Sequence, residues 1–182
     1  MEADFPGALH TWTDVINDTD IISGAHMNSA HAEIIAIEQN LFDLGQIARV
    51  YRNTSSQAIA RNSLVKIQWN AASFDDDSLF DISSDYYFTP TKSGYYHMIF
   101  QTTLLGYEVG KVVALYLRQG STTISKRIFE PKGTAEFDCH LSDYVNLTAD
   151  TDYQFMLFHT CSTAKTLGFG EQKSFACMKR VY

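Results

Sequence analysis

From Ala58 to the end, the chain consists of short runs that are either apolar or alternate between apolar and polar residues. Such runs are typical of antiparallel strands, because successive side chains of a strand point to opposite faces of its sheet. The runs expected to form strands cover residues 63–69, 86–88, 95–105, 112–119, 122–129, 135–147, 152–161 and 175–182. About eight short strands suit a jelly roll. The sequence therefore predicts a mainly β sandwich over residues 57–182.

Two of these expected strands are apolar on both faces, namely residues 95–100 and 153–161. A sandwich strand with one face in water should instead alternate with polar residues. We therefore expect neighbouring subunits to cover the outer face of these strands. The residues expected in this subunit interface are Tyr96, Met156 and Phe158.

Residues 26–49 follow a different pattern, in which apolar side chains recur in alternating steps of three and four. An isolated helix of about three heptads is marginal in water, so its apolar stripe must be covered. Isoleucine at both core positions of the central heptad favours three or four helices. We predict a coiled-coil stalk in a homotrimer; the alternative is an amphipathic helix packed against its own domain. The predicted stalk residues are Met27, Ile34, Ile37, Leu41 and Leu44.

The chain before this helix, residues 1–25, is polar and too short for a core of its own. It carries a tryptophan and two adjacent isoleucines, which suggests docking on another protein. We expect Trp12, Ile21 and Ile22 to anchor the chain. The polar residues 50–56 are expected to form a linker to the β domain.

Charge and hydropathy exclude several classes of partner. The formal net charge is −7, and such a surface repels phosphate backbones, so no nucleic-acid partner is expected. No apolar run is long enough for membrane insertion. The first residues lack the features of a signal peptide, so either the chain is made in a cytoplasm or a signal has been removed. Three widely spaced cysteines, an odd number, indicate free thiols.

Candidate metal and catalytic residues are few. Carboxylates of Asp75 and Asp77 are ligands that calcium prefers, and His140 with His159 would suit zinc. A solvated acidic loop and hydrogen-bonded histidines are the simpler interpretation, so we expect no metal or other cofactor. The sequence contains no recognisable nucleophile or metalloprotease motif, and no catalytic residue is predicted.

Two loops of the β domain carry aromatic and adaptable polar residues, which suit binding surfaces. Their candidate receptor-binding residues are Tyr107, Glu108 and Phe169. The equally weighted alternative is that these loops only connect the strands.

The sequence FTPTKSGYY at residues 88–96 resembles a signature of C1q-like domains. The runs at 66–70, 74–75 and 80–81 resemble the first strands of that family, and residues 174–182 resemble its last strand. The resemblance covers residues 57–182 and implies a C1q/TNF-like jelly roll that forms homotrimers.

The N-terminal part is similar to the start of tailed-phage fibre and spike proteins. The similar residues are WTD at 12–14, DIISGAHMN at 20–28, and the pairs at 33–34 and 37–38. This resemblance implies a non-enzymatic trimeric virion protein, made in the host cytoplasm. Its partners would be other virion structural proteins and a host surface glycan or protein. The alternatives are a head fibre without a receptor, and a non-viral C1q-like binding module. A collagen-like tract would favour the latter, and the sequence has none.

Overall fold

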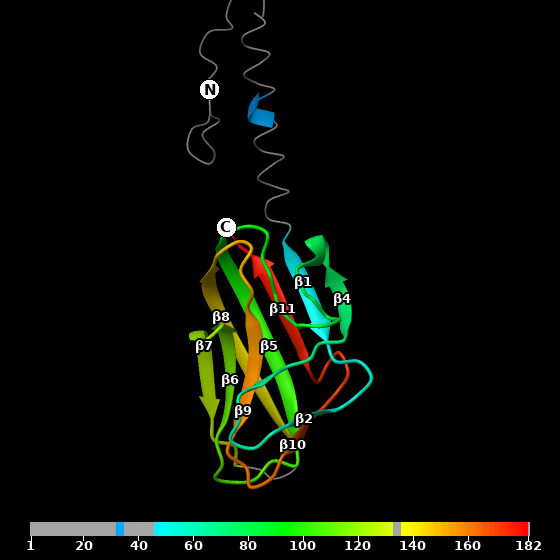
Figure 1. Cartoon of the computed structure of the whole chain (residues 1–182), viewed down its shortest axis with the longest axis vertical. Helices are drawn as coiled ribbons and strands as arrows, with labels where there is room; N and C mark the ends of the chain where they lie inside the picture. Colours follow the sequence, from blue (N-terminus) through cyan, green and yellow to red (C-terminus); the bar gives the residue numbers. More distant parts are fainter. Residues whose placement is uncertain (1–31, 35–45, 133–135, 182) are drawn as a thin grey trace, which may run out of the picture. The chain divides into compact units, whose positions relative to one another are not determined.

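The computed structural model describes residues 32–34, 46–132 and 136–181. Residues Gln46–Tyr182 form a compact unit, and its strands make a sandwich of two antiparallel sheets (Figure 1). The larger sheet has the order β2-β10-β5-β11-β1-β4, with β8 paired to the other edge of β5. The smaller sheet has the order β3-β9-β6-β7.

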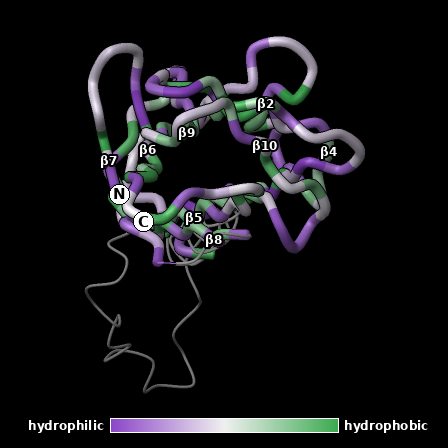
Figure 2. The backbone as a smooth tube through the Cα atoms, turned by 90° about the horizontal axis from the view of Figure 1, so that it is seen from below, coloured by the Kyte–Doolittle hydropathy of each residue, from purple (hydrophilic) through white to green (hydrophobic). Residues whose placement is uncertain are grey.

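The strands of the larger sheet are β1 (Ile47–Tyr51), β2 (Gln57–Ile59), β4 (Ala71–Asp75), β5 (Gly94–Leu105), β8 (Glu136–Leu147), β10 (Lys165–Leu167) and β11 (Phe175–Arg180). The strands of the smaller sheet are β3 (Val65–Lys66), β6 (Val113–Gln119), β7 (Thr122–Phe129) and β9 (Gln154–His159). A short 3-10 helix, η1, spans Asp76–Ser78. Seen end-on in Figure 2, β6, β7 and β9 lie in one layer and β5 and β8 in the other.

The longest strand pair of the sandwich is β5 with β8. The two pair over their full length, from Gly94 opposite Leu147 to Leu105 opposite Glu136. Alternate side chains of β5 are buried, beginning with Tyr96 and Met98, because they point between the sheets. The residues between them lie on the outer face of the larger sheet.

Aromatic rings fill the space between the sheets. The Trp69 ring meets Phe100 edge-on, with centroids 5.9 Å apart, and meets Phe155 in the same way at 6.2 Å. Phe88 packs edge-on against Tyr96 at 5.7 Å. Such pairs contribute about 0.5–1.5 kcal/mol each beyond the apolar area they bury. The aromatic enrichment of the sequence therefore serves the core of this sandwich.

The predicted mainly β fold is confirmed, and the expected strands 122–129, 95–105 and 135–147 agree closely with β7, β5 and β8. The boundary at residue 57 is wrong. Strand β1 pairs with β11 and β4, so the domain begins ten residues earlier. Its buried Ala48 and Val50 alternate with half-buried Ile47, Arg49 and Tyr51, which is the period of a strand. The predicted helix therefore cannot extend through 47–49, nor the linker include 50–51.

Of the part of the predicted helix that precedes Gln46, the structure describes residues 32–34, which are helical. Ile34, one of the predicted stalk residues, is 53% exposed there. The remaining stalk residues and the anchoring residues Trp12, Ile21 and Ile22 lie outside the described residues. In the part of the chain that is described, no helix has the length and apolar character needed to span a membrane.

Candidate interaction surface on the larger sheet

The outer face of the larger sheet is a broad, mostly uncharged surface built by cross-strand rows of side chains. Directly paired residues of antiparallel strands share a face, so the pairing register defines these rows. The central row contains Ser142, Ile99, Cys177 and Arg49, on β8, β5, β11 and β1 in turn. The row on one side contains Tyr144, His97, Lys179 and Ile47, and the row on the other contains His140, Gln101, Phe175 and Tyr51.

Apolar and aromatic side chains are exposed over this face. Tyr144 is 64% exposed, and Tyr95 and Phe74 are each about two-fifths exposed. Ile99 and Cys177, in the central row, are half-buried in the single chain. Large apolar side chains gathered on one face, rather than scattered singly, indicate an interaction surface.

One edge of this face is ordered by an aromatic stack. The His97 ring lies on the Tyr144 ring, with centroids 4.8 Å apart and planes 26° from parallel. The His97 Nε2 atom also lies 3.1 Å from the Ser142 hydroxyl. Because stacking and this hydrogen bond act together, the two rings are held in place before any partner binds.

The opposite edge is ordered by an ion pair. The Arg49 guanidinium lies over the Phe175 ring, 4.6 Å from its centroid, and pairs with the Glu171 carboxylate. Ser73 donates a hydrogen bond of 2.6 Å to the same carboxylate. This hydroxyl, followed by the charge of Arg49, lowers the pKa of Glu171. The exposed phenylalanine Phe74 lies opposite Arg49 on β4.

The cysteines of the larger sheet do not supply a reactive thiol. Cys139 is buried in the core and Cys177 is half-buried on the outer face. Burial raises the pKa of both thiols, and thereby keeps them protonated at neutral pH. Because the thiolate is the nucleophile, neither cysteine is set up for catalysis.

The expectation for Tyr96 is corrected. Tyr96 is wholly buried, and its hydroxyl donates to Gln46 Oε1 and to the Lys92 carbonyl oxygen. Desolvation raises its pKa to about 12. Its neighbours Tyr95 and His97 face outward instead. The sequence carried a signal for this, since polar His97 and Gln101 share a face with Tyr95 and mark that face as the outer one.

Met156 and Phe158 lie on the other sheet. Both are half-buried on β9, whose alternate residues Phe155 and Leu157 point into the core. They therefore face outward from the smaller sheet, on the side of the sandwich opposite to Tyr95. The prediction that they contact another subunit is not tested by a single chain.

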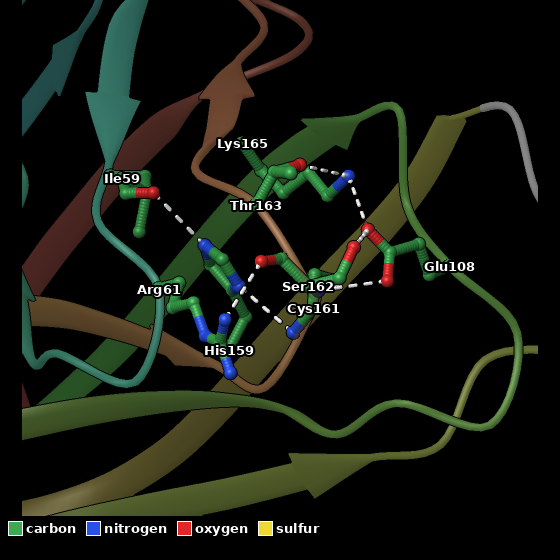
Figure 3. Close-up of polar contacts among 8 residues, drawn as sticks. All are labelled: Ile59, Arg61, Glu108, His159, Cys161, Ser162, Thr163 and Lys165. Atoms are coloured by element: carbon green, nitrogen blue, oxygen red, sulfur yellow. Dashed lines mark hydrogen bonds and ion pairs between the residues drawn. The ribbon is translucent and has the colours of Figure 1, made fainter.

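Most of the candidate receptor-binding residues make contacts within the head instead of pointing into solvent. Figure 3 shows the contacts of Glu108 with Ser162 and Lys165. Tyr107 is buried, and its hydroxyl donates to the Lys111 carbonyl oxygen, which removes it from a binding surface. The Glu108 carboxylate accepts hydrogen bonds from the Ser162 amide at 2.8 Å and its hydroxyl at 2.7 Å, and pairs with Lys165 at 2.7 Å. These contacts, Lys165 first, lower the pKa of Glu108 to about 2. Phe169 is 51% exposed and accessible to a partner.

The candidate zinc ligands do not meet. His140 is on β8 in the larger sheet, whereas His159 is on β9 in the smaller sheet, so the two histidines do not form a zinc-binding pair. The His159 ring is buried, with Nε2 3.0 Å from the Ile59 carbonyl oxygen and Nδ1 accepting the Cys161 amide (Figure 3). Both ring nitrogens of His159 therefore take part in hydrogen bonds to the backbone, at Ile59 and Cys161, and are not available to a metal ion.

The acidic candidate Asp75 also has a structural role. Its carboxylate accepts hydrogen bonds from the Leu79 and Phe80 amides, at 2.8 and 3.1 Å. Asp77 adopts a positive φ of 63° in the adjoining turn. Among the described residues, no group of three histidine, cysteine, aspartate or glutamate side chains is arranged to hold a metal ion.

Solved structures share this architecture. The Eiger TNF of S. frugiperda is 12% identical, with 75% of this chain and 92% of that one covered and a TM-score of 0.54. Murine APRIL at pH 5.0 is 11% identical, with 74% and 98% covered and a TM-score of 0.56. The fold is a C1q/TNF-like jelly roll. The globular domain of zebrafish complement 1qA is 16% identical, with 75% and 97% covered and a TM-score of 0.47.

At these identities the likeness shows the fold of the jelly roll alone. No protein-family model matches the chain. No curated protein matches its sequence.

Proposed function

We propose that this chain is a structural virion protein that acts as a homotrimer, with the jelly-roll head assembled through the outer face of the larger sheet. The observation that carries the proposal is the exposure of Tyr95, Tyr144 and Phe74 on one ordered, mostly uncharged face. Residues N-terminal to the head would attach it to the particle. The head would project and meet the host surface.

The composition of the outer face supports contact between copies of the chain. Its central positions, Ile99 and Cys177, are apolar, while Arg49 lies on β1, next to the edge strand β4, and Lys179 lies two residues from Cys177 toward the C-terminal end of β11. An apolar centre with charges at the rim is the usual anatomy of a protein interface. A cyclic trimer joins two different patches of each chain, which in this proposal are the two edges of the same face.

Two further arguments support three copies rather than two. Isoleucines 34 and 37 occupy both core positions of the predicted stalk, which favours three or four helices. The resemblance of residues 57–182 to C1q/TNF-like domains implies a trimer as well. These two supports come from different parts of the chain.

Placement on a virion is supported by the N-terminal resemblance to tailed-phage fibre and spike proteins, over about residues 10–45. In this proposal Trp12, Ile21 and Ile22 dock on other virion structural proteins. In this proposal the head is a binding module and not an enzyme. The protonated thiol of Cys139 and the engaged ring nitrogens of His159 support this reading.

Light scattering on the full chain and on residues 46–182 tests the assembly. We expect a threefold mass for the full chain, and monomers when Ile99→Arg places an unpaired cation at the centre of the face. The matched control is Ile128→Arg, an exposed isoleucine on the opposite sheet, which should leave the trimer intact. A monomeric wild-type full chain would refute the proposal.

Particle association is tested separately. Purified particles made with the wild-type chain should contain it, as measured by quantitative mass spectrometry. Trp12→Ala should lower the number of copies of the protein per particle, while the free protein should keep the oligomeric mass of the wild type. Unchanged incorporation of this variant would show that Trp12 is not an anchor.

A further inference from the structure

The outer face of the smaller sheet is a second surface, with a different chemistry. One cross-strand row contains Lys66, Met156, Tyr116 and Lys126, on β3, β9, β6 and β7 in turn. The next row along the strands contains Phe158, Ala114 and Ile128. Arg118 follows two residues after Tyr116 and so shares its face. The surface is therefore apolar in the middle, with cations at both ends of one row.

All formal charges on the strands of the smaller sheet are positive. These strands contain Lys66, Arg118, Lys126 and Arg127 and no aspartate or glutamate, in a chain whose net charge is −7. None of the four cations pairs with a carboxylate within residues 46–132 and 136–181. Ion pairs elsewhere in the head join Arg49 to Glu171, Lys165 to Glu108 and Lys173 to Glu136. The outer face of the smaller sheet thus carries Lys66, Arg118 and Lys126 without a salt-bridge partner among the described residues, and this positive charge attracts an anion.

The contacts of these cations hold them on the sheet without neutralising them. The Lys126 ammonium lies over the Tyr116 ring, 5.0 Å from its centroid. The Lys66 ammonium lies over the Tyr87 ring at 4.3 Å and donates to the Asp85 carbonyl oxygen. A ring or a carbonyl oxygen has no net charge, so both ammonium groups keep the capacity to bind a carboxylate or sulfate.

We propose that the outer face of the smaller sheet binds an anionic polysaccharide, whose acidic groups contact Lys66, Lys126 and Arg118 while its rings cover Met156, Phe158 and Tyr116. The assignment deepens the proposed function, on which it rests, by naming the class of host-surface partner. The face lies on the side of the sandwich opposite to the proposed subunit interface. It therefore stays accessible when the head assembles.

Two features favour a polysaccharide over an acidic peptide. Strands β9 and β6, at the apolar middle of the face, are hydrogen-bonded on both sides, so an extended peptide can add its backbone only at an edge strand such as β7 and not at this middle. The two lysines stand at opposite ends of a four-strand row, about 14 Å apart at three strand spacings. Such wide spacing over an apolar centre suits a chain with sparse charges separated by rings with apolar C–H faces.

Titration calorimetry with four defined polymers tests the proposal. Polygalacturonate supplies carboxylates, dextran sulfate supplies sulfates, dextran is the neutral control and poly-glutamate is the acidic peptide control. We expect the wild-type protein to bind at least one of the two anionic polysaccharides, and to bind dextran much more weakly. Affinity should fall as salt rises, because exposed charges are screened. Lys66→Glu with Lys126→Glu should weaken binding by about tenfold or more.

The matched control variant is Lys111→Glu with Lys132→Glu, which changes the net charge equally but alters two loop residues outside the smaller sheet. It should bind nearly as well as the wild-type protein. No binding to either anionic polysaccharide, or equal loss in both variants, would overturn the proposal. Poly-glutamate binding as tight as that of the polysaccharides would assign the face to an acidic protein partner instead.

The masses of all variants by light scattering keep this inference separable from the proposed function. A trimeric wild-type protein that binds neither anionic polysaccharide leaves the assembly in place and removes only the polysaccharide. A monomeric wild-type protein that binds through Lys66 and Lys126 would keep the polysaccharide site and remove the proposed trimer.

Discussion

At the scale of single residues, polar side chains of this head mainly fix loops to strands. The Glu108 carboxylate joins the loop after β5 to the segment at Ser162 and Lys165, and His159 joins β9 to the Ile59 carbonyl oxygen. Sequence patterns cannot predict such contacts, because Glu108 and Ser162 are far apart in the chain and meet only through the sheet topology. The predicted pair of His140 and His159 does not form for a different reason, which is that β8 and β9 belong to different sheets.

Glu108 gives a pH prediction. Its pKa in the folded chain, about 2, lies below the ordinary value of 4.5, so the carboxylate stabilises the fold above pH 4.5 and this contribution is lost as pH falls toward 2. Glu108→Gln should therefore melt at a lower temperature than wild type at pH 6. The difference should shrink steadily below pH 4.5, measured by circular dichroism melts. The effect should be modest, because the pair lies at the surface and is only partly buried.

A difference that persists unchanged at pH 2.5 would contradict this assignment. Glu136→Gln is the control, since Glu136 pairs with Lys173 at 3.2 Å and, within residues 46–132 and 136–181, accepts no hydrogen bond from a backbone amide of a loop. It should leave the melting temperature nearly unchanged at all pH values.

At the scale of elements, period-two alternation predicted the long strands, and failed where strands are short or compatible with a helix. β5, β7 and β8 carry enough residues to display the pattern. β10 has three residues, and β4 has mostly exposed ones, so neither shows a buried face in the sequence. The first three residues of β1 lie in the predicted helix because Ala48 fits both periods, and its last two lie in the predicted linker.

Strand β1 should be essential for the head. A chain that begins at Ser56 lacks β1, so β11 and β4 lose the strand with which both pair. A chain that begins at Gln46 keeps β1. Exposed strand edges pair with other chains, so we expect the shorter chain to aggregate. Size-exclusion chromatography and circular dichroism of the two chains would show this. A monodisperse, folded chain from Ser56 would mean that β1 is dispensable.

At the scale of the whole molecule, the sandwich gives its two sheets different roles. The outer face of the larger sheet is mostly uncharged and rich in exposed tyrosine, while the strands of the smaller sheet carry only positive charges. The sequence predicted that strands were apolar on both faces, and from this that a partner covers them. It could not show which sheet each strand joins, because that depends on pairing between distant segments.

Cys177 reports on the assembly. It lies at the centre of the outer face of the larger sheet, where a second copy of the chain would bury it completely. We expect iodoacetamide to modify it slowly in the wild-type protein and faster in Ile99→Arg, because the thiol is then exposed in a monomer. Mass spectrometry of the alkylated peptides would measure the two rates.

Cys139 and Cys161 are buried in the core of the single chain and serve as internal references. They should react slowly in both proteins, and all three thiols should react in urea. Equal rates for Cys177 in the wild-type protein and in Ile99→Arg would argue against burial of this face between subunits.

The position of β1 has a mechanical consequence for a protein held by its N-terminus. Gln46 precedes this strand, and its carbonyl oxygen accepts the Arg180 amide at 2.8 Å. β1 is flanked on one side by β11 and on the other by β4. A pull applied at Gln46 along the strand therefore loads two hydrogen-bonded ladders in shear at once, instead of peeling one bond after another from a free edge.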